Sequence, residues 1–140
     1  MMDLYCATDG IFPSVYQFYD SDGKPSLKAG NEEYIFTNVQ EAVRIAGEVP
    51  RKCSGKTKPP PVWAYTWHRY HGAPNALMSD QDETMYWEQS YKAGASGMVL
   101  WGNEPKEPGA SEFAAWWKSN FTAMINGWQP GRSSSAKVAN

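Results

Sequence analysis

Acidic side chains are the first candidates for chemistry in this sequence, because paired carboxylates serve as general acid and base in many hydrolases. Asp80, Asp82 and Glu83 lie close together. They begin a segment with helical patterning, and the dipole at a helix N-terminus favours carboxylates, so we interpret them as helix-starting residues rather than catalysts. Glu104 and Glu107 follow a short apolar segment and are the only acids that we nominate for catalysis by the chain alone.

Histidine and aspartate spacing does not predict a metal site. His68 and His71 stand three residues apart in a predicted surface loop, where a metal would need a third ligand and a fixed geometry. Asp20 and Asp22 precede Gly23, but the twelve-position calcium-loop pattern is absent, so a turn is the better interpretation. The sequence contains neither a glycine-rich phosphate loop nor a convincing Ser/His/Asp triad, and we expect no cofactor.

The composition is rich in aromatic residues and poor in aliphatic ones. Leu, Ile, Val and Phe make up only 20 of 140 residues, whereas 7 Trp and 8 Tyr are present. A low aliphatic share indicates disorder only together with a high net charge, and the net charge here is -2. Aromatic rings therefore supply the buried area of a core, and their polar tips also suit sugar binding. For any single ring, a place in the core is the simpler interpretation.

Charge and hydropathy exclude several classes of protein. A net charge of -2 gives no chain-wide basic field for binding nucleic acid. No run approaches the ~18 apolar residues that a transmembrane helix needs, so no membrane association is predicted. Residues 1–6 lack a basic start followed by a long apolar stretch, and we expect no signal peptide in this chain.

Hydrophobic patterning predicts strands that alternate with helices. The strands are expected at residues 11–18, 62–67 and 97–101, the helices at 31–46, 79–94 and about 111–125, and the loops at 51–61, 68–78 and 102–110. Pro13 places the first strand at a start, an edge or a bulge. Asn31 is expected to cap the first helix and Gly47 to follow its end. Ser79 and Asp82 resemble a capping box, and the continuously apolar last strand is typical of one buried on both faces.

Three βα units of this kind imply an α/β fold with parallel strands joined by right-handed helical crossovers. A βα barrel usually takes about 250 residues, and three parallel strands alone would leave exposed edges. We therefore expect either a small α/β domain or a partial (β/α) TIM-like barrel. The expected domain covers residues 1–128, followed by a flexible tail at 129–140.

Four short segments hold sequences distinctive enough to compare with known families. They are Phe-Pro-Ser-Val-Tyr at 12–16, Asn-Val-Gln-Glu-Ala-Val-Arg at 38–44, Pro-Val-Trp-Ala-Tyr-Thr at 61–66 and Ala-Gly-Ala-Ser-Gly-Met-Val-Leu-Trp-Gly at 93–102. In the same order and at similar spacing, these resemble Tyr-Pro-Ser-Ile-Tyr, Arg-Val-Arg-Glu-Ala-Ile-Arg, Pro-Val-Phe-Ala-Tyr-Thr and Leu-Gly-Ala-Ala-Gly-Val-Val-Leu-Trp-Gly of the hyaluronidase family of glycoside hydrolases. Residues 103–140 match the family poorly.

The resemblance implies a distorted βα barrel that cleaves hexosaminidic bonds in hyaluronan- and chondroitin-type glycosaminoglycans with retention. In that family, a Glu two residues after an Asp is the general acid, and the N-acetyl oxygen of the substrate replaces the second carboxylate as nucleophile. The Asp-x-Glu pair precedes the family segment that residues 12–16 resemble. The chain therefore resembles the C-terminal half of the barrel, and we expect it to be inactive alone, with another chain or segment completing the barrel.

Four positions match residues that line the family's substrate cleft. By resemblance, Ser14 and Tyr16 lie beside the N-acetyl group of the substrate, Tyr65 lines the same cleft, and Trp101 forms a wall of the sugar subsite. All four lie at or near the C-terminal ends of predicted strands, where barrels place their sites. Residues of the 68–78 loop follow one of these strands and can touch sugar too. The alternative is that the three rings fill the barrel core.

Cysteines, a sequon and the family resemblance bear on where the chain works. Cys6 and Cys53 are the only cysteines, and spacing alone leaves a disulfide and two thiols open. Asn120 starts a glycosylation sequon, which is used only if the chain is secreted. The resemblance implies a secreted or lysosomal protein. Two other interpretations stay open: a non-catalytic carbohydrate-binding or interaction module, and an incomplete gene model.

Overall fold

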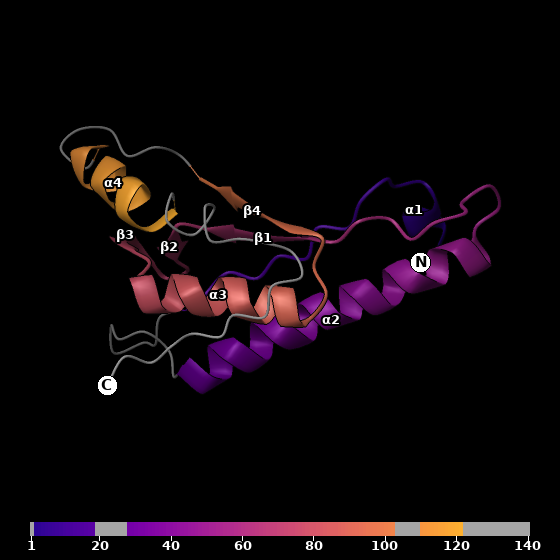
Figure 1. The fold of residues 1–140 in the computed structure, drawn as a ribbon, viewed down its shortest axis with the longest axis horizontal. Coiled ribbons are helices and arrows are strands. Elements are labelled where there is room, and N and C mark those ends of the chain that lie inside the picture. The colour runs from indigo at the N-terminus through magenta and orange to yellow at the C-terminus, as the bar shows by residue number, and fades with distance from the viewer. Residues whose placement is uncertain (1, 19–27, 103–109, 122–140) are drawn as a thin grey trace. The chain divides into compact units, whose positions relative to one another are not determined.

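The computed structural model describes residues 2–18, 28–102 and 110–121 (Figure 1). The elements are the helices α1 (Met2–Cys6), α2 (Lys28–Lys52), α3 (Asp80–Lys92) and α4 (Ala110–Trp116), the strands β1 (Trp63–Trp67), β2 (Arg69–Tyr70), β3 (Ala73–Leu77) and β4 (Gly97–Trp101), and a π-helical turn at Trp117–Phe121. The chain divides into two compact units, Met1–Asn103 and Glu104–Asn140. Within the described ranges, no helix combines the length and the apolar character needed to cross a membrane.

Parallel strands organise the first unit. β1 pairs with β4 in parallel, with Trp63 opposite Gly97 and Trp67 opposite Trp101. On the other side of β1, residues 11–18 run parallel to it through isolated bridges. α2 connects this segment to β1, and α3 connects β1 to β4. The predicted mixture of helices and parallel strands is therefore confirmed.

Pro13 explains why residues 11–18 form bridges instead of a continuous strand. Before Pro13, the N–H of Trp63 donates to the carbonyl of Ile11 at 2.9 Å; after it, the N–H of Tyr65 donates to the carbonyl of Pro13 at 2.9 Å. The hydrogen bond between these two would run from the N–H of residue 13 to the carbonyl of Trp63, and proline has no N–H. The ladder therefore lacks one hydrogen bond and is divided into separate bridges.

α2 is longer than the sequence predicts at both ends. It begins before Asn31, which is therefore not its cap; this side chain is buried, and its Oδ1 accepts a hydrogen bond from the N–H of Phe18 at 3.4 Å. Gly47 does not end the helix, which continues for a further turn and buries Val49 completely. Burial of a valine contributes about 1.5 kcal/mol or more, which offsets the cost of about 1 kcal/mol for a helical glycine.

The core of the first unit lies where α2 and α3 pack against one face of the parallel strands (Figure 1). Its buried members come from both helices, from residues 11–18, from β1 and from the residues that directly precede β1 and follow α3: Ile11, Val15, Ile35, Val39, Ala42, Ala46, Val62, Ala64, Met85, Tyr86 and Ala93. The Tyr86 hydroxyl is buried, and it donates to the carbonyl of Ala64 at 2.9 Å. Side chains on the opposite face of β1 remain partly exposed.

α3 begins as the capping-box pattern predicts. The Oγ of Ser79 accepts a hydrogen bond from the N–H of Asp82 at 3.2 Å, and it donates to the Asp82 carboxylate at 2.7 Å. That carboxylate also accepts a hydrogen bond from the Tyr70 hydroxyl at 2.5 Å, which ties β2 to the start of α3. The helix ends just before Gly94, whose φ of 93° is the left-handed conformation that such a helix end requires.

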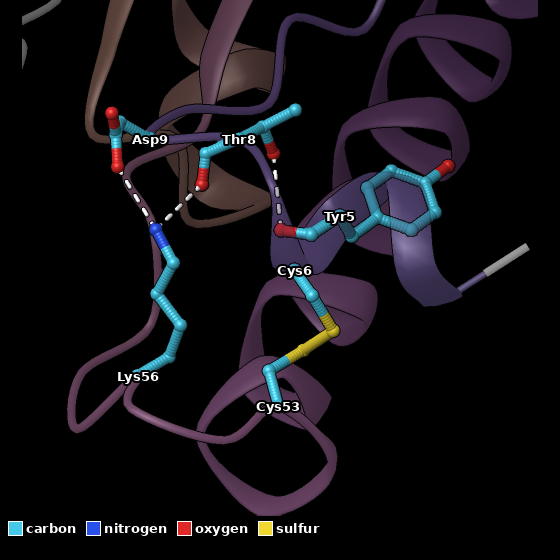
Figure 2. Close-up of a disulfide and its surroundings, with 6 residues drawn as sticks. All are labelled: Tyr5, Cys6, Thr8, Asp9, Cys53 and Lys56. Carbon is cyan, nitrogen blue, oxygen red and sulfur yellow. Dashed lines mark hydrogen bonds and ion pairs between the residues drawn. A yellow bond between two sulfur atoms is a disulfide. The ribbon is translucent and has the colours of Figure 1, made fainter.

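Cys6 and Cys53 form a disulfide, so the two cysteines are not free thiols (Figure 2). The bridge joins the last residue of α1 to the residue that follows α2. Beside it, the Lys56 Nζ donates to the carbonyl of Thr8 at 3.1 Å and to the carboxylate of Asp9 at 2.9 Å. The hydrogen bond and the charge of the ammonium hold the pKa of Asp9 below its usual range.

Residues 68–78 are not the loop that the sequence predicts, because they contain the antiparallel hairpin β2–β3. Tyr70 pairs with Ala73 across a two-residue turn formed by His71 and Gly72. Gly72 has a φ of 94°, which tight hairpin turns of this length require and which glycine adopts without strain.

β4 also differs from its prediction. Gly97 to Leu100 are half-buried and Trp101 is exposed, so the strand is not buried on both faces. The reason is that the described helices of this unit cover only one face of the parallel strands.

The second unit contains part of the third predicted helix. α4 and the π-helical turn after it extend to residue 121, and the rest of the predicted 111–125 helix lies outside the described residues. The Phe113 ring stacks on Trp116 at 5.9 Å and lies 6.1 Å from Trp117. Asn120 lies in the π-helical turn, while the last sequon residue and the 129–140 tail are outside the described residues.

Candidate functional site

Three residues predicted for a sugar cleft, Tyr16, Tyr65 and Trp101, come together in the first unit. The rings of Tyr65 and Trp101 stack with their centroids 5.6 Å apart and their planes at 19°. The Tyr16 ring lies edge-on to both, 6.3 Å from Tyr65 and 6.4 Å from Trp101. The Nε1–H of Trp101 donates a hydrogen bond to the Tyr16 hydroxyl at 2.6 Å. These three residues are called the ring cluster below.

The parallel register is what brings the ring cluster together. Trp101 is the last residue of β4, and Tyr65 lies on the adjacent strand β1. Tyr16 lies two residues beyond the bridge that joins Ser14 to Tyr65. Side chains alternate along each segment, so the residues on either side of Tyr16 and Tyr65 are buried under the helices while the two phenol rings face the open side. All three rings are therefore on the same face, toward the C-terminal ends of their strands.

Ser14 is the fourth predicted site residue, and it lies next to the ring cluster on the same segment as Tyr16. Its side chain is exposed. Its backbone carbonyl accepts a hydrogen bond from the hydroxyl of Tyr34 at 3.3 Å, which connects this segment to α2.

The Tyr65 hydroxyl of the ring cluster is protonated at neutral pH. Burial raises the pKa of Tyr65, and the neighbouring Tyr16 raises it further, so the Tyr65 hydroxyl keeps its proton and can donate a hydrogen bond. The Tyr16 oxygen accepts a hydrogen bond from the Trp101 indole, and a phenol that accepts one hydrogen bond can still donate its own proton to a second group.

His71 is a member of this surface that its sequence spacing did not reveal. Its exposed imidazole stacks on the ring of Tyr16, with centroids 6.2 Å apart and planes at 26°. It also contacts the Phe18 ring edge-on at 5.3 Å. Within the described part of the 68–78 segment, His71 is the residue that contacts the ring cluster. The signal that would have found it is the pair His71-Gly72, which marks a tight turn directly after a strand.

His68 is buried, whereas its place in a predicted loop indicates a surface histidine. It is 2% exposed, and its Nε2 accepts a hydrogen bond from the Nε of Arg69 at 3.2 Å. Burial and the positive charge of Arg69 lower the pKa of His68 to about 4, so the imidazole is neutral at physiological pH. Among the described residues, no group of three His, Cys, Asp or Glu side chains is placed to hold a metal ion.

The carboxylates considered from sequence have structural surroundings or lie outside the described residues. Asp80, Asp82 and Glu83 occupy the first turn of α3, as the helix-dipole argument predicts. The remaining four candidate acids, Asp20, Asp22, Glu104 and Glu107, lie outside the described residues.

The ring cluster is suited to binding rather than to bond cleavage. Flat aromatic faces contact the apolar C–H face of a pyranose, while hydroxyl and indole groups at their edges bond its polar substituents. In the part of the chain that the structure describes, the three rings contact one another and His71. A cluster of this composition has the groups needed to orient a sugar, and it includes no carboxylic acid that could protonate a leaving oxygen.

Comparison with known proteins agrees with this geometry. A family model described as hyaluronidase matches residues 1–116. Two crystal structures of bee venom hyaluronidase, one in a monoclinic form and one in complex with a hyaluronic acid tetramer, superpose on the chain with a TM-score of 0.74 and 21% sequence identity. A search of curated proteins finds no match.

The chain corresponds to only part of these relatives. The match covers 89% of this chain but 37% of the bee venom enzyme in one structure and 36% in the other. At this identity the likeness establishes the fold, that of a hyaluronidase βα barrel. The family match extends over most of the 140 residues and includes the whole ring cluster. The chain therefore belongs to the hyaluronidase family of glycoside hydrolases.

Proposed function

We propose that this chain forms the substrate-binding part of a hyaluronidase-like glycoside hydrolase. The substrate class is a glycosaminoglycan of the hyaluronan or chondroitin type, which contains N-acetylated hexosamines. The observation that carries the proposal is the convergence of Tyr16, Tyr65 and Trp101 on one open face of parallel strands. The crystal structure of bee venom hyaluronidase with a hyaluronic acid tetramer supports the same class of ligand.

Each member of the ring cluster has a distinct role in this proposal. The half-exposed Trp101 indole is the wall against which the sugar ring stacks. Tyr65 supports that indole from its other face through the 19° stack. Tyr16, fixed by the indole N–H, directs its own hydroxyl proton to the N-acetyl oxygen, and Ser14 borders the same group. The orientation of that oxygen matters because it acts as the nucleophile when the substrate itself supplies one.

The proposal also gives the chain its place in a barrel. Residues 11–18 with α2, β1 with α3, and β4 with the helix that includes α4 are three consecutive βα units, within a domain of residues 1–128. The parallel order of the first three strand segments and the similarity to bee venom hyaluronidase support this arrangement. Another segment or chain completes the barrel.

The 140 residues contain no Asp-x-Glu sequence, the pattern that holds the general acid in the family. Without a proton donor to the leaving oxygen, glycosidic cleavage loses a contribution of about 10²–10⁴-fold. We therefore expect these 140 residues alone to bind the polymer and not to hydrolyse it.

A binding and turnover experiment tests the proposal. Calorimetric titration of the purified chain with hyaluronan tetrasaccharide is expected to show saturable binding, and a reducing-end assay is expected to show no product. Trp101→Ala is expected to weaken binding about tenfold, because it removes the stacking wall. The matched control is Trp63→Ala, since Trp63 is 42% exposed against 44% for Trp101 and lies at the opposite end of β1. Absence of binding heat with the wild-type chain would contradict the binding proposal. Robust turnover would contradict the expectation that these 140 residues lack a general acid.

The chain is proposed to work outside the cell or in the lysosome. The disulfide between Cys6 and Cys53 supports this location, because structural disulfides persist in oxidising compartments and are rare in the cytosol.

A further inference from the structure

We propose that His71, Phe18 and Tyr34 form a second sugar subsite beside the ring cluster, which takes the next pyranose of the same polymer. This inference rests on the proposed function and extends it. The three residues are called the ring row below.

The ring row continues the ring cluster without a break. The His71 imidazole stacks on Tyr16 at 6.2 Å and contacts the Phe18 ring at 5.3 Å. The Phe18 ring in turn meets the Tyr34 ring edge-on at 5.4 Å. A line of neighbouring ring contacts therefore leads from Trp101 on β4 to Tyr34 on α2. An extended polymer that stacks on the ring cluster and runs from Trp101 towards α2 therefore contacts the ring row with its next pyranose.

The ring row is exposed enough to take a ligand. Phe18 is 39% exposed although its ring contacts two other rings, and the imidazole of His71 is exposed as well. Contiguous exposed rings are typical of binding surfaces, and these rings are continuous with the ring cluster.

The chemistry of the row favours a sugar over a purely apolar ligand. The row mixes one hydrocarbon ring, Phe18, with the imidazole of His71 and the phenol of Tyr34. Imidazole and phenol edges bond hydroxyl groups, while the faces contact C–H groups. The same mixture characterises the ring cluster, with which the row is continuous.

Hydrogen bonds behind the row hold it in place before any ligand binds. The backbone N–H of His71 donates to the carbonyl of Gln17 at 2.8 Å. The side chain of Gln17 is fully buried, and its Nε2 donates to the carbonyl of Asp82 at 2.7 Å. The N–H of Phe18 donates to Asn31 Oδ1 at 3.4 Å. A surface that is already ordered loses little conformational entropy on binding, which favours affinity.

The test compares two ligand lengths by NMR titration of the full chain. The wild-type chain is expected to bind hyaluronan disaccharide about five- to tenfold more tightly than N-acetylglucosamine, because only the disaccharide places a second pyranose on the row. His71→Ala and Phe18→Ala are each expected to reduce this length-dependent gain by more than half, and Phe18→Ala is also expected to leave N-acetylglucosamine affinity unchanged. His71 lies in an exposed turn, so its variant is expected to fold even if Phe18→Ala does not.

Phe12→Ala is the matched control. Phe12 lies on the same segment as Phe18 and is also exposed, but its ring contacts Trp63 instead of the row. This variant is expected to keep both affinities. A wild-type gain with ligand length that survives in His71→Ala and Phe18→Ala overturns the second subsite and leaves the proposed function standing. Failure of the wild-type chain to bind either ligand overturns both.

Discussion

The double variant Cys6→Ser/Cys53→Ser is expected to be less stable than the wild-type chain by about 4 kcal/mol. The reason is that the bridge spans 47 residues and lowers the conformational entropy of the unfolded chain. The loss is large against the total stability of an ordinary domain, which is about 5–15 kcal/mol. Urea unfolding followed by tryptophan fluorescence measures the difference, with both proteins purified under oxidising conditions.

Two controls separate the disulfide from its surroundings. A reductant is expected to destabilise the wild-type chain to the level of the double variant and to leave the variant unchanged. Lys56→Met removes the contacts of that ammonium with Thr8 and Asp9 but keeps the bridge, and it is expected to cost far less, because Asp9 is solvent-exposed. Equal midpoints for the oxidised wild-type chain and the double variant would falsify this account of how α1 is held.

Glu83→Gln is expected to stabilise the chain by about 3 kcal/mol at pH 8.5 and to have little effect near pH 4. Glu83 is 4% exposed, and burial raises its pKa to about 7. The interaction with Trp87 lowers this pKa, but its effect is smaller than that of burial. The folded state thus holds a proton that the unfolded chain has already released between about pH 4.5 and 7. The stability that this proton contributes is fully present below pH 4.5 and is lost as the pH rises through 7. Glutamine does not titrate and avoids that loss.

Unfolding measured across a pH series tests this prediction through the difference between variant and wild type. His68 gives a slope of opposite sign, because its pKa is lowered to about 4 and the wild-type chain loses stability as the pH falls from 6.5 towards that value. This contribution is common to both proteins and cancels in the difference. Glu88→Gln, on the exposed side of α3, is the matched control and is expected to change the stability by about 0.5 kcal/mol or less. A constant difference between Glu83→Gln and the wild type at all pH values would contradict a buried carboxyl.

Features set by neighbouring residues were predictable from the sequence. The Ser79 and Asp82 pair specified the start of α3, and Gly94 specified its end, because caps depend on residues within one turn. The alternation of strand and helix patterns specified parallel strands, and this placed Tyr16, Tyr65 and Trp101 at corresponding strand ends.

Features set by tertiary contacts were not predictable in this way. α2 passes through Gly47 because residues beyond it are buried, and burial overrides the local preference of one glycine. His68 is buried and His71 exposed although they stand three residues apart, because a hairpin that packs against α3 separates them. The pairing of Cys6 with Cys53 likewise depends on the meeting of α1 with the end of α2.

The central claim is that Tyr16, Tyr65 and Trp101 form one sugar-binding surface, and the Trp101 indole N–H reports on it most directly. Its NMR resonance is assigned by its loss in Trp101→Phe and followed while hyaluronan tetrasaccharide is added. The account predicts a saturable shift, because a sugar on this surface perturbs the 2.6 Å hydrogen bond to the Tyr16 hydroxyl. A Trp101 resonance that stays in place while the ligand saturates the protein elsewhere would contradict it.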